Sequence, residues 1–280
     1  MFELFTDSAA NLPASEDYRV LPLHCTLGDR EVGEDFPPED FFGALRSGEL
    51  CSTSLVNVAE FLEAFRSALE RGRDVVYVGL SHALSGTFRA AELAAEELRE
   101  EFPERRIEPV DSLSSSLGAG LLVLRGAELR RGGADTADTA RKLRELTEQT
   151  VSLLTVTDLK YLQRTGRLSG SAALIGGALN VKAVLTCTMQ GECVVTGKAR
   201  GTRRVLELMA ERWKEHRADP AETVGITHAD NESEALRLLE LLRERGFTGE
   251  CRMAVCDHIT GAHTGPDSVG LFFHGAGREA

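Results

Sequence analysis

The sequence predicts an α/β protein in which an N-terminal parallel-sheet α/β domain is followed by a C-terminal α+β domain with a mixed or antiparallel sheet. Two observations predict this class. In the first half, short apolar runs typical of strands buried on both faces alternate with amphipathic helical stretches. In the second half, two strand-like runs are joined by a short turn, as in a hairpin. The domains are expected at 1–150 and 151–280.

The first half contains three apolar or β-rich runs, at 2–5, 74–80 and 106–110. Helices are expected between and after them because apolar residues recur there at spacings of three and four. These helices are placed at 58–69, 88–102, 116–131 and 136–149. Asn57 and Glu60 have the spacing of a capping box at the start of the first one. The β-then-α order favours a compact α/β unit.

The second half opens with the predicted hairpin, whose strands are 181–189 and 192–200. The later elements follow from periodicity and from helix-start signals, among them a capping-box spacing at Asn231 and Glu234. Helices are expected at 202–216 and 231–245, and strands at 223–228, 251–258 and 268–275.

Composition excludes several classes of protein. The chain has 280 residues, 42% of them hydrophobic, which suffices for two ordinary cores. A net charge of −12 would repel a phosphate backbone, so nucleic acid is not an expected partner. Glu3 and Asp7 lie where a signal peptide would be apolar, and no apolar run is long enough to cross a bilayer. We therefore expect a cytoplasmic protein.

Cysteine and histidine spacing gives little support for a metal or cofactor. The six cysteines form no C-x-x-C pair and are expected to be reduced. The tightest metal-like group, Cys256, His258 and His263, lacks a second ligand pair at zinc spacing. Signatures of nucleotide-binding loops, serine hydrolases and zinc proteases are absent from the sequence. Neither a metal nor a cofactor is predicted.

Hydroxyl-rich loops follow the three predicted strands of the first half, at 6–11, 81–87 and 111–120. The carboxyl ends of strands in a wound sheet converge on one edge, where ligands bind. The segment 52–54 can add hydroxyls there. Ser85, Gly86 and Thr87 open a helix, whose backbone amides and dipole favour an anion. This pattern indicates recognition of a carboxylate or phosphate by neutral donors.

Two other interpretations of these loops stay open. Serine and threonine at a helix start are ordinary N-caps. A hydrolase or acyl transferase is the second alternative, with Ser85, His263 and Asp7 as the reacting neighbourhood. His82 lies three residues from Ser85, but this spacing does not establish the geometry of a nucleophile and its base.

Seven separated segments carry a resemblance to a known family. In order along the chain they are FTDSAANLP, STSLVNVAEF, SHALSGTFRAA, VDSLSSSLGAG, LKYLQRTGRLSG, GALNVKAVLT with GECVVTGKARG, and AHTGPDSVGL. In sequence and order they resemble the DegV family. The resemblance implies two α/β domains with a lipid held between them. It also implies a fatty-acid-binding subunit of a bacterial fatty acid kinase.

The resemblance assigns roles to individual residues. It implies that Thr53 and Ser85, with Gly86 in the same turn, bind the carboxylate of a long-chain fatty acid, and that His263 lies near this head group. A separate fatty acid kinase catalytic subunit would transfer phosphate from ATP, so this chain would hold no catalytic residue, and transient contact with a membrane is compatible with that role. For Arg200 and Arg203, contact with the phosphate or the partner and mere flanking of a helix start both stay open.

The chain departs from the family pattern at several positions. Leu55-Val56 replaces a usual Gln-Pro, Ala183 a usual proline and Asp267 a usual glycine, which puts the acyl-chain preference in doubt. His82 replaces a more common small residue beside the head-group turn. Apolar residues at 168, 174, 175 and 179 fit either a tunnel wall or plain core.

Overall fold

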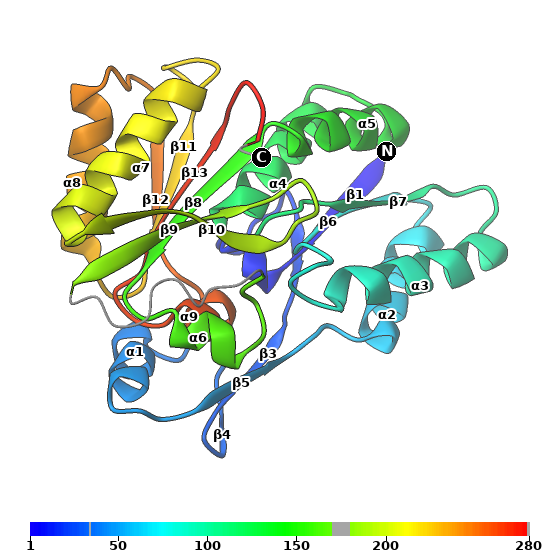
Figure 1. Ribbon diagram of the computed structural model, residues 1–280. Coiled ribbons are helices and arrows are strands. Elements are labelled where there is room, and N and C mark those ends of the chain that lie inside the picture. The colour runs from blue at the N-terminus through cyan, green and yellow to red at the C-terminus, as the bar shows by residue number, and fades with distance from the viewer. Residues whose placement is uncertain (34, 170–179, 279–280) are drawn as a thin grey trace.

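The computed structural model describes residues 1–33, 35–169 and 180–278 (Figure 1). Its helices are the short 3-10 helix η1 (Ser8–Ala10), α1 (Pro38–Arg46), α2 (Val58–Glu70), α3 (Thr87–Glu101), α4 (Leu117–Arg131), α5 (Thr136–Thr147), α6 (Lys160–Arg164), α7 (Thr202–His216), α8 (Glu232–Glu244) and α9 (His258–Thr264). Its strands are β1 (Phe2–Asp7), β2 (Arg19–Leu21), β3 (His24–Leu27), β4 (Arg30–Glu31), β5 (Cys51–Ser54), β6 (Asp74–Gly79), β7 (Ile107–Asp111), β8 (Thr150–Val156), β9 (Val181–Cys187), β10 (Cys193–Arg200), β11 (Val224–His228), β12 (Cys251–Val255) and β13 (Val269–His274).

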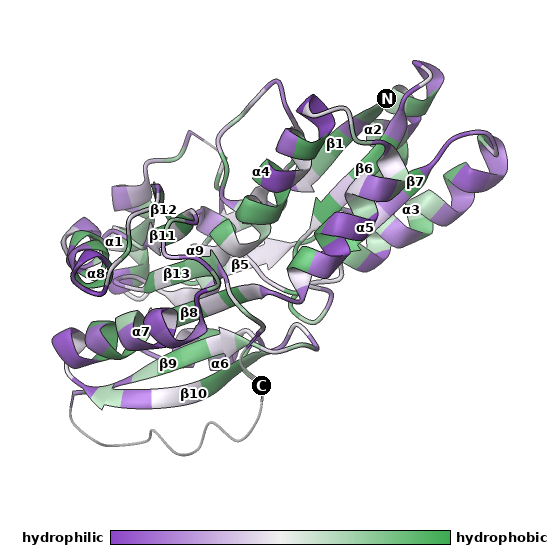
Figure 2. Ribbon diagram, turned by 90° about the horizontal axis from the view of Figure 1, so that it is seen from above, coloured by the Kyte–Doolittle hydropathy of each residue, from purple (hydrophilic) through white to green (hydrophobic). Residues whose placement is uncertain are grey.

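The first half is built on a parallel sheet of order β2-β1-β6-β7. Successive strand residues point to opposite faces, so Phe5 and Tyr77 pack with α2 and α3 while Leu4 and Val76 pack with α4 and α5. Both faces are therefore buried, as the continuous apolar runs predict. The helices turn their hydrophobic sides toward the sheet and their polar sides outward (Figure 2).

The second half is built on a six-stranded sheet of order β10-β9-β8-β13-β11-β12. All neighbours in it are antiparallel except β11 and β12. The predicted hairpin is β9–β10, with an irregularity between Val195 and Gly197. Helices α7 and α8 cover one face, around the buried Trp213 and Leu238. The predicted class, a parallel-sheet part followed by a mixed-sheet part, is confirmed.

The sheet of the second half begins at Thr150, next to the boundary expected from the sequence. One core nevertheless crosses this point, because Cys256, Ile259 and Ala262 belong to the hydrophobic cluster of the first half. Arg46 also bridges the halves, with Nη1 2.6 Å from an Asp230 carboxylate oxygen and Nη2 2.8 Å from an Asp267 oxygen. Two independently folding domains, 1–150 and 151–280, stay a prediction.

A third, three-stranded sheet of order β4-β3-β5 was not predicted. Its strands are two to four residues long, and β5 reads Cys-Ser-Thr-Ser, which lacks the apolar character used to recognise strands. The helices α6 and α9 were not predicted either, because with five and seven residues they are too short to show a helical apolar period. These elements matter because β5 and α9 carry Thr53 and His263.

The two predicted capping boxes have different outcomes. At Asn57 the box is present, with its side chain accepting from the Glu60 amide and the Glu60 side chain accepting from the Asn57 amide. At Asn231 the prediction is wrong, because that side chain makes no capping bond to α8. Its Nδ2 instead donates to the Asp267 carbonyl, at 3.4 Å, and its backbone N–H donates to His228 Nδ1. Its Oδ1 accepts from the Ser233 hydroxyl at 3.4 Å, so the side chain contacts the first turn of α8 without capping a backbone amide.

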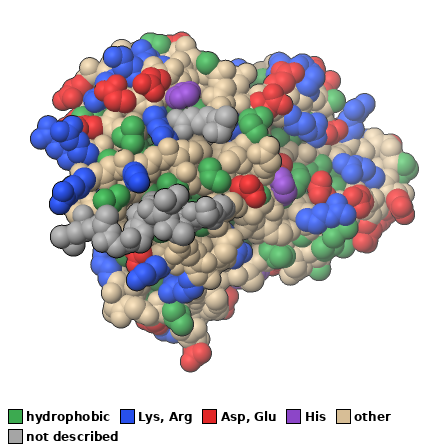
Figure 3. Space-filling model, viewed as in Figure 1, with side chains coloured by type: hydrophobic (Ala, Val, Ile, Leu, Met, Phe, Trp, Pro, Cys, Tyr) green, Lys and Arg blue, Asp and Glu red, His purple; other side chains and the backbone are tan. Residues whose placement is uncertain are grey.

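Within the three described ranges, no helix combines the length and the apolar character required to cross a membrane. On the face shown in Figure 3, acidic and basic side chains are intermixed over much of the surface. On this face, therefore, the charges of both signs are interspersed rather than separated into two blocks.

The buried His274 is expected to make the stability of the fold depend on pH. Burial lowers its pKa to about 4, and the positive charges of Arg125 and Arg278 add to the shift. Since the folded-state pKa lies below the ordinary 6.5, the unfolded chain takes up the proton first as the pH falls. This group therefore costs stability progressively between pH 6.5 and 4.

The His274→Gln variant should lack this loss. Its free energy of unfolding, relative to the wild type, should improve by up to about 1.4 kcal/mol for each pH unit lowered within that window. Urea unfolding at several pH values measures this difference. A difference that stays constant from pH 7 to pH 4 would contradict the assignment.

Candidate functional site

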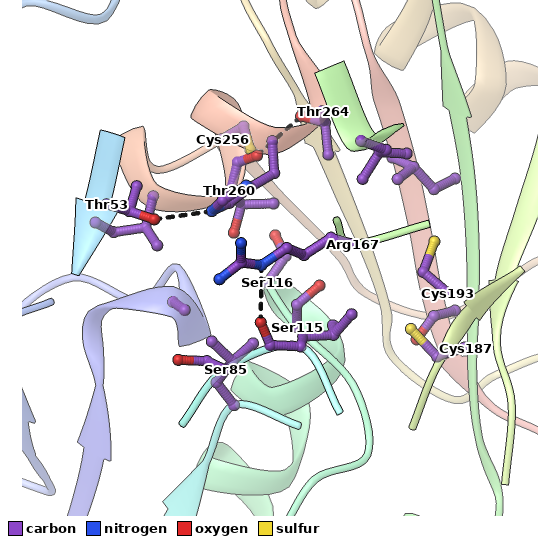
Figure 4. Close-up of a pocket in the computed structure, with 18 of the residues that line it drawn as sticks. Thr53, Ser85, Ser115, Ser116, Arg167, Cys187, Cys193, Cys256, Thr260 and Thr264 are labelled. Carbon is purple, nitrogen blue, oxygen red and sulfur yellow. Dashed lines mark hydrogen bonds between the residues drawn. The ribbon is translucent and has the colours of Figure 1, made fainter. Parts of the chain in front are cut away.

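A cavity of about 340 Å³ lies between the two large sheets, within the range usual for small-molecule sites (Figure 4). Its wall is drawn from both halves of the chain. The described lining residues are Ala9, Leu23, Thr53, Ser54, Leu55, Leu80, Leu84, Ser85, Gly86, Ser115, Ser116, Ser152, Leu154, Leu162, Arg167, Leu185, Thr186, Cys187, Cys193, Thr227, Cys256, Ile259, Thr260, His263, Thr264, Ser268 and Phe272.

The cavity has an open end and a buried end. Ser54, Leu55 and Gly86 are exposed lining residues, and Leu55 is 38% exposed. Leu185 and Phe272, at 0% and 4% exposure, are fully buried lining residues. The polar side chains of β5 and of the turn before α3 belong to the open end. The wall therefore suits a molecule with a polar head near the surface and an apolar body inside.

Thr53 and His263 meet at this cavity although they are far apart in the sequence. Thr53 Oγ1 lies 3.0 Å from His263 Nε2, which joins β5 to α9. Helix α9 begins at Asp257, whose side chain accepts from the Thr260 amide at 2.8 Å. The cap fixes the helix start and places His263 on the second turn, facing β5.

His263 is a neutral ligand group at physiological pH. Burial lowers its pKa to about 4, and the positive charge of Arg167 adds to the effect. Its Nδ1 is buried, and none of the described residues provides it with a hydrogen-bond partner. The imidazole therefore has one hydrogen-bonding position, Nδ1, that no described residue uses.

Ser85 and Gly86 form the turn that opens α3. The Ser85 hydroxyl lies 2.9 Å from Thr87 Oγ1 and accepts from the Thr87 amide at 3.2 Å. Gly86 is the N-cap residue and has no side chain to cap the helix. A Cβ at Gly86 would approach Leu55 Cδ2 to 3.1 Å, so glycine keeps the open end wide. The Ser85 hydroxyl thus caps the first amide of α3, at Thr87.

Arg167 supplies a positive charge that sequence reasoning did not single out. Its Nε donates to the Leu84 carbonyl at 3.1 Å, and its Nη1 donates to the Thr165 carbonyl. These two bonds use part of the five guanidinium donors. In Figure 4 the guanidinium is drawn between Thr53 and the serines 85, 115 and 116. Arg167 is the one Arg or Lys on the described cavity wall, in the segment LKYLQRTGRLSG quoted above.

The structure thus brings four of the predicted site residues together at one cavity: Thr53, Ser85, Gly86 and His263. Arg200 ends β10 and Arg203 lies in the first turn of α7, and neither belongs to the described wall. Both are exposed, and Arg203 Nε pairs with a Glu207 oxygen at 2.9 Å. His82 is also exposed, with Nδ1 2.6 Å from an Asp111 oxygen.

The tunnel-wall candidates have mixed outcomes. Leu168 packs against the small cluster around Leu162 and Leu185 but does not line the cavity. Leu174, Ile175 and Leu179 lie outside the described residues. The apolar wall comes instead from Leu154, Leu185 and Phe272. Cys187 and Cys193, which lie opposite each other on β9 and β10 as free thiols, also contribute to it.

The three residues of the hydrolase alternative, Ser85, His263 and Asp7, are not hydrogen-bonded to one another among the described contacts. Asp7 accepts from Tyr77 Oη at 2.6 Å and from the Leu80 amide at 2.9 Å, so its carboxylate is engaged inside the first sheet. Burial raises its pKa. The Ser85 hydroxyl is hydrogen-bonded to the Thr87 hydroxyl, and His263 is hydrogen-bonded to Thr53.

Within residues 1–33, 35–169 and 180–278, no three His, Cys, Asp or Glu side chains are grouped to hold a metal ion.

These features define an α/β protein with two large sheets and a cavity lined by neutral hydroxyls, an imidazole and one arginine together with apolar side chains. A family model described as "Uncharacterised protein, DegV family" matches residues 1–275. A DegV domain-containing protein of Clostridium perfringens is 33% identical over 287 residues, covering 99% of each chain. The chain therefore belongs to the DegV family, and this part of the sequence prediction is confirmed.

Two solved structures are similar over nearly their whole length. One is of a fatty-acid-binding DegV family protein from Thermus thermophilus, with a TM-score of 0.87, 30% identity, and coverage of 98% of this chain and 99% of that one. The other is of a fatty-acid-binding DegV family protein from Streptococcus agalactiae, with a TM-score of 0.88, 26% identity and the same coverage.

Proposed function

We propose that this protein binds one long-chain fatty acid, with the carboxylate at Thr53, Ser85, Gly86 and His263 and the chain in the apolar part of the cavity. One observation carries the proposal: a single described cavity combines hydroxyls, a neutral imidazole and Arg167 with leucines and Phe272, and its exposed lining residues Ser54, Leu55 and Gly86 are sequence neighbours of Thr53 and Ser85. The fatty-acid-binding relatives support the same ligand class.

The tail accounts for most of the expected affinity. Burying one methylene is worth about 0.8 kcal/mol, so a chain of about fifteen could gain roughly 12 kcal/mol before the costs of ordering are subtracted. The head group then sets orientation, because hydrogen bonds to a charged group are worth about 1.5–3 kcal/mol each.

The accessible position of the head group suits presentation to a partner enzyme. Because Ser54, Leu55 and Gly86 are exposed lining residues, a carboxylate bound beside them is within reach of a second protein. We propose that the partner is a cytoplasmic fatty acid kinase, which forms the acyl-phosphate on the bound carboxylate. Arg200 and Arg203 are exposed and do not belong to the described cavity wall. In this proposal they would therefore contact the partner kinase and not the bound acid.

Native mass spectrometry of freshly purified and of delipidated protein tests ligand binding. The account expects a retained mass that matches one fatty acid, and its return when palmitate is added to the delipidated protein. Lipid-free protein that fails to take up palmitate and hydrolyses model esters unaided would favour the serine-hydrolase alternative instead.

Filling the buried end should shorten the preferred chain. Cys187 is a lining residue, 8% exposed, and Cys187→Phe would place a ring in the space left for the tail. We expect at least about tenfold weaker binding of a sixteen-carbon acid, which corresponds to the loss of about two buried methylenes. Binding of an eight-carbon acid should be unchanged.

Isothermal titration with both acids measures this selectivity. The Cys251→Phe variant serves as the control, since Cys251 lies on β12 outside the described cavity wall. Equal losses for both chain lengths in Cys187→Phe would show that this position does not face the tail.

A further inference from the structure

Ser116 has a backbone conformation that serine rarely adopts. It precedes α4, with φ 52° and ψ −144°, a region populated almost exclusively by glycine. The neighbouring structure imposes this conformation. The Ser116 amide donates to the Ala9 carbonyl at 2.7 Å, and the Ser116 carbonyl accepts from the Gly120 amide at 3.0 Å.

The start of α4 is wedged between η1 and the second sheet. A Cβ at Gly120 would approach the Ala10 carbonyl oxygen to 2.7 Å, and one at Gly225 would approach Leu117 Cβ to 2.8 Å. Leu117 is buried against Phe272. Close packing against η1 on one side and against β11 on the other leaves the backbone at Ser116 little room to relax. A glycine at this position would adopt the same conformation without strain.

The Ser116 side chain has a second unusual property. It lines the cavity, is 1% exposed, and its hydroxyl is buried without a hydrogen-bond partner among the residues that the structure describes. A buried hydroxyl without a hydrogen bond destabilises the fold unless a water molecule or a ligand provides the missing partner.

We infer that Ser116 is a further head-group residue, which the strained backbone holds in place so that its hydroxyl donates a hydrogen bond to the fatty-acid carboxylate. The inference rests on the proposed function. With the Ser116 side chain turned toward the cavity that it lines, a carboxylate there would complete the unpartnered hydroxyl, and the positive end of the fifteen-residue α4 favours an anion beside it. Ser116 is thus an unfavourable residue for folding at a position where it is useful for binding.

Glycine and alanine substitutions separate binding from folding. Ser116→Gly removes the hydroxyl and accepts the backbone conformation, so its melting temperature should equal or exceed that of the wild type. Ser116→Ala removes the hydroxyl and keeps the strain. In both variants we expect the affinity for palmitate to fall about tenfold or more, as for a lost hydrogen bond to a charged group. A residue that serves the fold alone would not produce weaker binding together with undiminished stability.

Thr155→Val is the matched control. Thr155 also has a buried hydroxyl without a described partner, but it lies outside the described cavity wall. Its palmitate affinity should equal that of the wild type.

Titration of each protein with palmitate and with 1-hexadecanol locates the bond at the carboxylate. The wild type should prefer the acid, and this preference should shrink in both Ser116 variants. Unchanged palmitate affinity in Ser116→Gly would overturn the inference while leaving the proposed function intact. A wild type that binds no palmitate would remove both. A covalent acyl adduct on Ser116 after treatment with p-nitrophenyl palmitate would also overturn it, since the serine would then be a nucleophile.

Discussion

The Arg167→Met variant is expected to bind palmitate about 10- to 100-fold more weakly than the wild type. Arg167 is the one Arg or Lys on the described cavity wall, and His263 beside it is neutral because burial lowers its pKa to about 4. The variant therefore leaves the carboxylate with neutral donors alone, and one charge-assisted hydrogen bond is worth about 1.5–3 kcal/mol. Fluorescence displacement with palmitate measures the loss.

Two comparisons show whether the charge is responsible. Methyl palmitate carries no charge, so Arg167→Met should change its binding little. Arg237→Met serves as the control variant, because Arg237 is exposed on α8 and lies outside the described cavity wall. An equal loss for the acid and the ester would mean that the substitution distorts the cavity instead of removing a carboxylate contact.

The Thr53→Ala, Ser85→Ala double variant should lose nearly all acyl-phosphate formation with a purified fatty acid kinase. These two hydroxyls come from separate elements, β5 and the turn before α3, and in the proposed complex they would position the carboxylate from two sides. Misplacing a reacting group by about 1 Å can cost about 100-fold in rate, and two lost bonds also weaken binding. Trapping the product with hydroxylamine measures the rate at saturating palmitate.

The control for the double variant is Ser52→Ala. Ser52 neighbours Thr53 on β5, but its hydroxyl is exposed and lies 2.6 Å from Thr26 Oγ1. Its acyl-phosphate rate should match that of the wild type. Undiminished activity in the double variant would reject Thr53 and Ser85 as head-group residues.

The fold could be predicted where the sequence pattern follows directly from burial. Strands β1 and β6 are buried on both faces and read as apolar runs, and α2 and α3 show a clear apolar stripe. The small sheet could not be predicted, because the polar β5 forms through pairing with β3 and not through an apolar pattern of its own. The Asn231 capping box is absent because the side chain makes other contacts, Nδ2 with the Asp267 carbonyl and Oδ1 with the Ser233 hydroxyl.

The site shows the same division. The hydroxyl-rich loop pattern already pointed to the segment 52–54 and to Ser85 and Gly86, whereas His263 was added by the resemblance, since neither periodicity nor spacing connects β5 with α9. Arg167 and Ser116 lay inside segments that resemble the family but carried no separate signal. An arginine reveals its role through what surrounds it, and the strained backbone of Ser116 is a property of the folded chain. Both became recognisable when the two halves enclosed a common cavity.

The central claim is that one fatty acid lies with its carboxylate at the hydroxyl-rich open end and its tail toward Phe272. A crystal structure with a fatty acid carrying bromine on its last carbon tests this directly, because anomalous scattering locates the tail. We predict bromine between Leu185 and Phe272, and carboxylate oxygens within hydrogen-bond distance of Thr53 and Ser85. Bromine at the open end beside Leu55, or bound outside the cavity, would contradict the account.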